Sequence, residues 1–203
     1  MLSLLDACRL VGLAPITSMS LHVAAYLCEI FAPASSRTPM DGKVLKERGT
    51  PYYPALQQDV DRLIGMGLVR IDGMQEKCIG DGLSVLLPSL RLESGRAEPL
   101  LEALRSLPDE EETYDFLFEV IQAFSRLSDE QIPYSMAEDA TYGNPSVDKG
   151  EVIDLGEWVN PEATPTSHVA AQIRGLASET MNFAEIMDIY VNHIAYRLDH
   201  GHR

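Results

Sequence analysis

The chain is organised around the stretch between Gly49 and Ile79, which reads GTPYYPALQQDVDRLIGMGLVRIDGMQEKCI. Pro54 suits the first position of a helix, because the first N–H groups of a helix lack partners and proline has no N–H. Gly67 follows where the C-terminal end of a helix favours a positive φ. Between them, apolar side chains recur at the spacing of one helix face, which predicts a helix over residues 54–66. These side chains are Leu56, Val60, Leu63 and Ile64.

The residues after this helix predict a β-hairpin. Residues 68–71 and 74–79 are two short runs of strand-forming side chains. Asp72 and Gly73 lie between the two runs, and an Asp-Gly pair favours a tight turn. A helix followed by a hairpin is the second half of a winged helix-turn-helix.

The first half of that motif is predicted directly upstream. Asp41 can cap a short helix that runs through Arg48. Residues 49–51 then form the turn, and the helix over residues 54–66 takes the place of the recognition helix.

The remaining residues predict mostly helices, over 2–11, 18–31, 96–107, 109–127, 166–177 and 182–200. The helix over 109–127 has only one narrow polar stripe, so we expect it to be the most buried helix. Residues 128–166 are mostly irregular, with one possible strand at 151–155. The expected fold class is mainly α with a small β-wing: a winged helix-turn-helix N-terminal module followed by a helical C-terminal part. We expect a winged-helix module in residues 1–90 and a helical region in residues 91–203, packed as one unit.

The charge of the chain is unevenly distributed. The 203 residues carry a formal net charge of −15. Residues 1–72 hold seven acidic and seven basic side chains, and residues 73–203 hold 24 acidic and nine basic ones. An acidic body repels the phosphate backbone of nucleic acids and also keeps a protein soluble.

The composition is that of an ordinary globular protein of the cytoplasm. Hydrophobic residues make up 45% of the chain, and no apolar run approaches the about 18 residues of a membrane span. The three cysteines are widely spaced and form no CxxC pair, so we expect small core side chains in a reducing compartment. We expect no contact with a membrane.

No catalytic, cofactor-binding or metal-binding motif is present in the sequence. The five histidines include no HExxH and no pair at metal-ligand spacing. The chain also lacks a GxSxG, a P-loop and a GxGxxG. We therefore expect no enzyme, no cofactor and no metal site.

The predicted recognition helix has a neutral outer face, which is formed by Gln58, Asp61, Arg62 and Gly65. Proteins that insert a helix into a DNA groove normally supply several cations per module. Weak contact with DNA is possible through Lys46, Arg48 and Arg62, but independent sequence-specific binding is not expected. A role in docking to other proteins is favoured for this module.

The last helix predicts a surface for such docking. Its core face is wide, and Ile189 and Tyr196 fall outside it, one turn on either side of His193. Two alternatives are open: a second layer of the same fold covers these side chains, or they bind a partner.

The segment from Thr50 to Leu68 resembles the helix and turn of the middle-component subunits of bacterial three-component ABC/SMC-like defence systems, the accessory subunits of Lamassu-type systems. Further similarities are short, and they lie at residues 139–142, residues 152–154, Trp158, and Tyr190 with its neighbours Val191, His193 and Arg197. The segment from Gly49 to Pro51 is more distantly similar to Panacea-type antitoxin domains, which share a Gly-x-Pro segment before a helix.

The first resemblance implies a non-catalytic accessory subunit that bridges an SMC-like ATPase and an effector in an anti-phage or anti-plasmid complex. In such a complex the ATPase senses foreign or aberrant DNA ends, and the effector is inactive until DNA is engaged. On this basis Tyr142 and Trp158 are hypothetical partner contacts, together with Ile189, His193 and Tyr196. The alternative is a winged-helix transcriptional regulator or antitoxin that acts alone on DNA or on a toxin.

Overall fold

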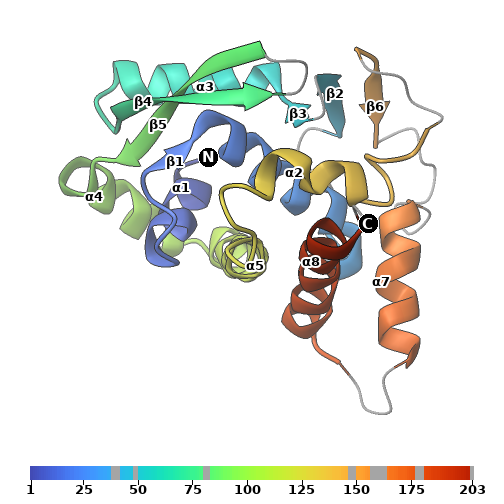
Figure 1. Ribbon diagram of the computed structural model, residues 1–203. Helices are drawn as coiled ribbons and strands as arrows, with labels where there is room; N and C mark the ends of the chain where they lie inside the picture. Colours follow the sequence, from blue (N-terminus) through green and yellow to red (C-terminus); the bar gives the residue numbers. More distant parts are fainter. Residues whose placement is uncertain are drawn as a thin grey trace.

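The computed structural model describes residues 1–37, 42–47, 50–79, 83–145, 150–155, 164–176 and 181–201. Over these residues the chain forms eight α-helices and two small three-stranded sheets, so it is a mixed helical and β structure (Figure 1). The sheets lie along one side of the molecule and the long helices α5, α7 and α8 lie on the other.

Most helices begin and end close to where the sequence predicts, whereas the short helix Ile132–Ser135 lies in a segment that was expected to be irregular. The helices are α1 (Leu2–Leu10), α2 (Ser18–Phe31), α3 (Pro54–Gly65), α4 (Ser94–Arg105), α5 (Pro108–Phe124), α6 (Ile132–Ser135), α7 (Pro165–Leu176) and α8 (Phe183–His200), with 3-10 turns η1 (Pro33–Ser35) and η2 (Met136–Glu138). Asn182 caps α8 in a reciprocal capping box with Glu185, as its sequence position predicts. The cap of α2 is Thr17, whose hydroxyl oxygen accepts a hydrogen bond from the Ser20 N–H at 3.1 Å.

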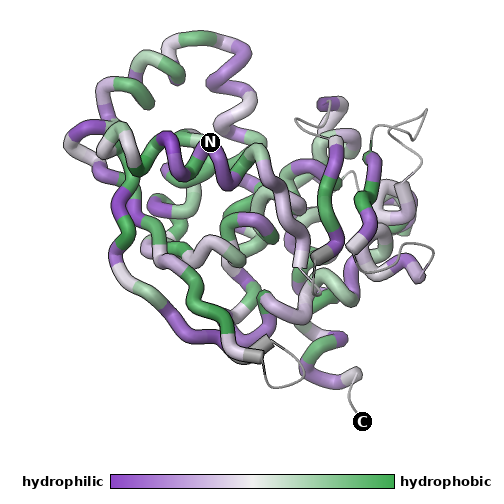
Figure 2. The backbone as a smooth tube through the Cα atoms, turned by 90° about the horizontal axis from the view of Figure 1, so that it is seen from above, coloured by the Kyte–Doolittle hydropathy of each residue, from purple (hydrophilic) through white to green (hydrophobic). Residues whose placement is uncertain are grey.

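Both sheets are antiparallel. The first contains β1 (Ile16–Thr17), β4 (Val69–Ile79) and β5 (Leu83–Leu92) in the order β1-β5-β4. The second contains β2 (Lys43–Glu47), β3 (Thr50–Tyr52) and β6 (Val152–Asp154) in the order β3-β2-β6. The long β4–β5 hairpin reaches the periphery of the molecule, as the view from the side of the sheets shows (Figure 2).

The predicted winged helix-turn-helix is not confirmed, because its first helix was wrong. Residues 43–47 form strand β2, and residues 50–52 form strand β3 where the helix-turn-helix turn was expected. In strand β2, Val44 pairs with Ile153 of β6 and is fully buried. That long-range pairing decides the conformation of a segment too short to be stable as a helix by itself.

The turn expected at Asp72 and Gly73 was also wrong. Strand β4 continues through both residues, and its pairing with β5 shifts between Ile71 and Gly73, which marks a β-bulge. Glycine and a short polar side chain tolerate the irregular backbone of a bulge as well as that of a turn, which explains the error.

Helix α2 is the centre of the core. All of its residues except Ser18 are buried, so the prediction that the helix over residues 109–127 would be the most buried was wrong. Helices α5, α6 and α7 and strands β3 and β5 all pack against α2. The predicted apolar stripe of α3 is confirmed: Val60 is buried, and Leu56, Leu63 and Ile64 pack against the core. Gly67 has the predicted positive φ of +68°.

Candidate functional site

The arginines of α3 and of the β4–β5 hairpin form ion pairs, and Lys77 of the hairpin donates a hydrogen bond to the carbonyl oxygen of Asp129 at 2.8 Å. Arg62 on α3 lies 3.0 Å from the Asp59 carboxylate. In the hairpin, Arg70 contacts Asp72 at 3.0 Å, and Arg91 contacts the other oxygen of Asp72 at 2.7 Å. The hydrogen bond from Arg91, followed by the charge of Arg70, holds the pKa of Asp72 below its usual value, so this carboxylate stays ionised.

A hollow of about 480 Å³ opens beside this ion-pair cluster. It lies between the C-terminal end of α3, the start of β4 and the start of α4, and it is lined by Ile64, Gly67, Val69, Arg70, Ile71, Glu93 and Arg96. The Ile71 side chain is 51% exposed. No local sequence pattern points to Arg96 or to this hollow, because the lining residues lie on three different elements.

Arg96 differs from the other cations of the chain. Within the described residues, Arg96 and Arg174 are the two basic side chains for which the structure shows neither an ion pair nor a hydrogen bond. The Arg96 guanidinium lies against the backbone of Gly67, and a Cβ at that glycine would be 2.3 Å from Nη1 of Arg96. Gly67 is therefore favoured by its positive φ, and its missing side chain leaves room for the Arg96 guanidinium.

The outer stripe of α8 carries the predicted partner-binding residues. Ile189 is 40% exposed, Tyr196 is 61% exposed, and His193 between them is also exposed. The core face of the helix is buried as predicted, so these three side chains lie outside it. The ring of Tyr196 stacks on His200, with ring centroids 4.2 Å apart. Helix α8 lies between α5 and α7, and neither helix covers this stripe (Figure 1).

The other predicted site residues lie elsewhere. Tyr142 is 1% exposed, with its ring edge-on to Tyr26 at 5.5 Å, so a partner could not reach it in this structure. Lys46 lies over the ring of Tyr142 and donates a hydrogen bond to the carbonyl oxygen of Asn144 at 3.2 Å. Arg48 and Trp158 lie outside the residues that the structure describes.

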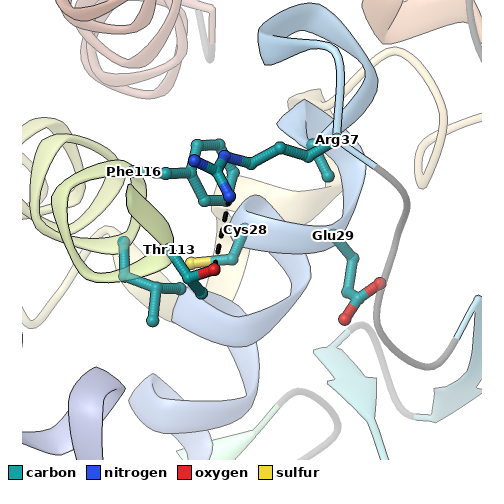
Figure 3. A pocket seen from close by; sticks show the side chains of 7 residues that line it. Cys28, Glu29, Arg37, Thr113 and Phe116 are labelled. Atoms are coloured by element: carbon teal, nitrogen blue, oxygen red, sulfur yellow. Dashed lines mark hydrogen bonds between the residues drawn. The ribbon is translucent and has the colours of Figure 1, made fainter. Parts of the chain in front are cut away.

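A second hollow, of about 290 Å³, lies between α2 and α5 (Figure 3). Arg37 extends across it, with its guanidinium 5.6 Å from the centre of the Phe116 ring and its Nη1 donating to Thr113 at 3.3 Å. Cys28 lines the hollow, and burial raises the pKa of its thiol well above the usual value. A thiol that stays protonated is a poor nucleophile.

Asp139 is the centre of the most extensive buried polar cluster. Its carboxylate is 1% exposed and accepts five hydrogen bonds of 2.6–3.0 Å. The donors are the hydroxyls of Tyr26, Thr166 and Tyr190 and the backbone N–H groups of Thr141 and Tyr142. No described basic side chain forms an ion pair with it. Because these contacts are internal hydrogen bonds, the cluster joins α2, α7 and α8 structurally.

Asp6 is another buried carboxylate, and it contacts two arginines. Arg9 contacts one oxygen at 2.6 Å, and Arg105 contacts the other. Tyr114 donates a further hydrogen bond at 2.9 Å. These contacts join α1, α4 and α5.

His22 is buried between α2 and β3. Its Nδ1 accepts a hydrogen bond from the Tyr53 N–H at 3.1 Å, which leaves the proton of the neutral ring on Nε2. Burial lowers the pKa of His22 to about 4, and a contact with Gln57 offsets only part of that effect. A histidine that is neutral at physiological pH and enclosed by tyrosines has a packing role here.

Metal binding and membrane insertion find no support in the described part of the chain. No group of three or more His, Cys, Asp or Glu side chains there could hold a metal ion. Across the same residues, no helix is both long and apolar enough to span a membrane. Comparison of the chain with protein-family models, with curated proteins and with solved structures found no match in any of the three.

Proposed function

We propose that the chain is a non-catalytic accessory subunit that docks onto an SMC-like ATPase and an effector in a bacterial anti-phage or anti-plasmid defence complex. The observation that carries the proposal is the ion pairing of the arginines on α3 and the β4–β5 hairpin. Arg62, Arg70 and Arg91 each have a carboxylate within 3.0 Å. A cation that is already paired with a carboxylate gains little binding free energy from a phosphate group. Either the carboxylate must first be displaced, or it stays in place and repels the nucleic acid.

Exposed apolar side chains also support docking. On the hairpin, Met74 of β4 pairs with Pro88 of β5. Leu86 lies two residues before Pro88 and on the same face of β5. Met74 is 57% exposed and Leu86 is 66% exposed. On α8, Ile189 and Tyr196 form a second exposed apolar line. Large apolar and aromatic side chains are the usual anchors of protein interfaces.

The alternative function is that of a winged-helix regulator or antitoxin. One observation supports it: the observed order is α1, β1, α2, β2, β3, α3 and hairpin, with β1 beside β5, and it would match a winged helix if β2 and β3 were an insertion. In that arrangement α2 and α3 would be the two helices of the motif, and β2 and β3 would be an insertion between them. This second candidate predicts tight binding of the isolated chain to DNA or to a toxin.

Two measurements distinguish the candidates. For the accessory subunit, the purified chain should bind duplex DNA with a Kd of about 10⁻⁴ M or weaker at physiological salt, and it should co-purify with an ATPase and an effector encoded by neighbouring genes. A sub-micromolar, sequence-dependent gel shift by the chain alone would instead establish the regulator. An Arg62→Gln variant is the control, because loss of the shift in this variant would locate DNA on α3.

A further inference from the structure

We propose that the hollow beside Arg96 receives a segment of a partner protein that presents an apolar side chain next to a carboxylate. This inference rests on the proposed docking function and names the surface and the chemistry of the contact. The hollow has about 480 Å³ of space and a floor that includes Ile64 and Val69. Ile71 at its rim is 51% exposed, so an apolar side chain placed there would remove apolar surface from water on both sides.

Charge complementarity identifies the second part of the ligand. At the rim, Arg70 bridges Asp72 and Glu93, each at 3.0 Å, and Arg91 pairs with Asp72. These four charges cancel, so Arg96 leaves a local charge of +1 on a chain whose net charge is −15. A guanidinium with no internal partner binds a carboxylate through two parallel hydrogen bonds, which gives the contact both strength and direction.

The Arg96 side chain lies beside the end of α3. Its guanidinium lies against Gly67, at the C-terminal end of α3, where the helix dipole favours a cation. Leu100 follows one turn later on α4 and is 43% exposed, which extends the apolar surface beside the guanidinium.

DNA is a poorer occupant of this surface. Duplex DNA carries one negative charge per about 1.7 Å of its axis, and its binding normally uses several unpaired cations. The hollow offers one such cation, and its other neighbours are apolar side chains and ion-paired arginines. A protein segment fits both the apolar floor and the single charge.

The test uses the full chain and the purified ATPase and effector encoded by the neighbouring genes, with binding measured by biolayer interferometry. Arg96→Glu and Ile71→Ser should each weaken binding to one of these subunits at least tenfold. Arg96→Lys should weaken it less, because an ammonium cannot form the paired hydrogen bonds of a guanidinium. Arg174→Glu is the matched control, since it reverses the other unpaired cation, and should change the Kd less than twofold. Thermal melts establish that all four variants are folded.

Each outcome decides between the two claims. If the wild-type chain binds but Arg96→Glu and Ile71→Ser bind equally well, the hollow is not the interface and the docking function stands. If the wild-type chain binds neither subunit, the docking function fails and this inference fails with it. If a 30-base-pair duplex binds the wild type with micromolar affinity and Arg96→Glu abolishes that binding, the hollow contacts nucleic acid and the inference is overturned. If Arg96→Glu weakens binding to a subunit and crosslinking identifies the partner carboxylate, reversing the charge of that carboxylate should restore binding of the Arg96→Glu variant.

Discussion

Asp6 and Asp139 are both almost fully buried, yet the protein stabilises the two carboxylates in opposite ways. Asp6 has two arginine partners whose side chains are each 33% exposed, so the positive charges face water on their outer side. Asp139 accepts hydrogen bonds only from neutral groups, and these groups are themselves buried. The difference shows that a buried carboxylate at the edge of a core can be stabilised by ion pairs with partly exposed arginines. At the centre of this core, the buried carboxylate is stabilised by hydrogen bonds from neutral hydroxyl and N–H groups.

The comparison predicts that Asp139 is the costlier carboxylate to change. Asp139→Asn keeps the shape of the side chain but sets an NH₂ group against hydroxyl donors. We expect the free energy of unfolding to fall by about 3 kcal/mol or more, because several buried donors lose their acceptor. Urea denaturation measures this loss, and a change below about 0.5 kcal/mol would show that the hydroxyls can find other acceptors.

Asp6→Asn should cost less, about 1–2 kcal/mol, because water can solvate the outer side of Arg9 and Arg105 once the charge is removed. Denaturation at two salt concentrations sharpens the contrast. The Asp6 contribution should shrink at high salt, whereas the Asp139 contribution should not. Equal salt dependence of the two variants would contradict the distinction between ionic and neutral compensation.

High pH should act mainly on the Asp139 cluster. Burial, and then the charge of Asp139, raise the pKa of Tyr26 and of Tyr190 above the usual value. In the unfolded chain a tyrosine ionises near pH 10, so the stabilisation from these residues is complete below pH 10 and is lost as the pH rises further. Tyr190→Phe should reduce the slope of stability against pH above pH 10 by about 1.4 kcal/mol per unit.

Tyr114 provides the matched control for that experiment. Burial also raises its pKa, but this residue is half-buried beside Arg105, which opposes the shift. Tyr114→Phe should therefore change the high-pH slope less than Tyr190→Phe does. The reverse order would mean that the Asp6 cluster, and not the Asp139 cluster, governs alkaline unfolding.

The smallest effect on folding is expected on the surface of α8, in the same helix that contributes Tyr190 to the Asp139 cluster. Ile189→Ala combined with Tyr196→Ala should lower the free energy of unfolding by no more than about 1 kcal/mol, because both side chains are exposed. The same variant should weaken assembly with the ATPase or effector by about 2 kcal/mol or more. A thermal melt and a co-purification are made on one preparation. A collapsed melt with intact assembly would show that these side chains stabilise the fold and that the interface lies elsewhere.

The sequence predicted well what is decided locally. The caps, the proline at the start of α3 and the apolar stripes of α3 and α8 are read from neighbouring residues, and the helices are where those signals indicate. Strand β2 lies between β3, which follows it directly, and β6, which is more than a hundred residues away, and no local pattern announces the pairing with β6. The bulge at Asp72 was read as a turn because both use the same residue types.

The candidate sites followed the same rule. The exposure of Ile189, His193 and Tyr196 could be derived from helical spacing within one element. The burial of Tyr142 and the hollow beside Arg96 depend on contacts among several elements, so spacing could not reveal them. Asp139 stood out in the sequence only through a short resemblance, and its role became visible once Tyr26 and Tyr190 were found on either side of it.

The central position of α2 also has a consequence during protein synthesis. This helix leaves the ribosome early, but its cover α5, and Tyr190 of α8 beside it, belong to the second half of the chain. At about 5–20 residues per second, about 10–30 s pass between the completion of α2 and that of α8. During that interval part of the surface that buries α2 in the folded protein has not yet been synthesised. The order of the elements along the gene thus makes the last helix the step that completes the cover of α2.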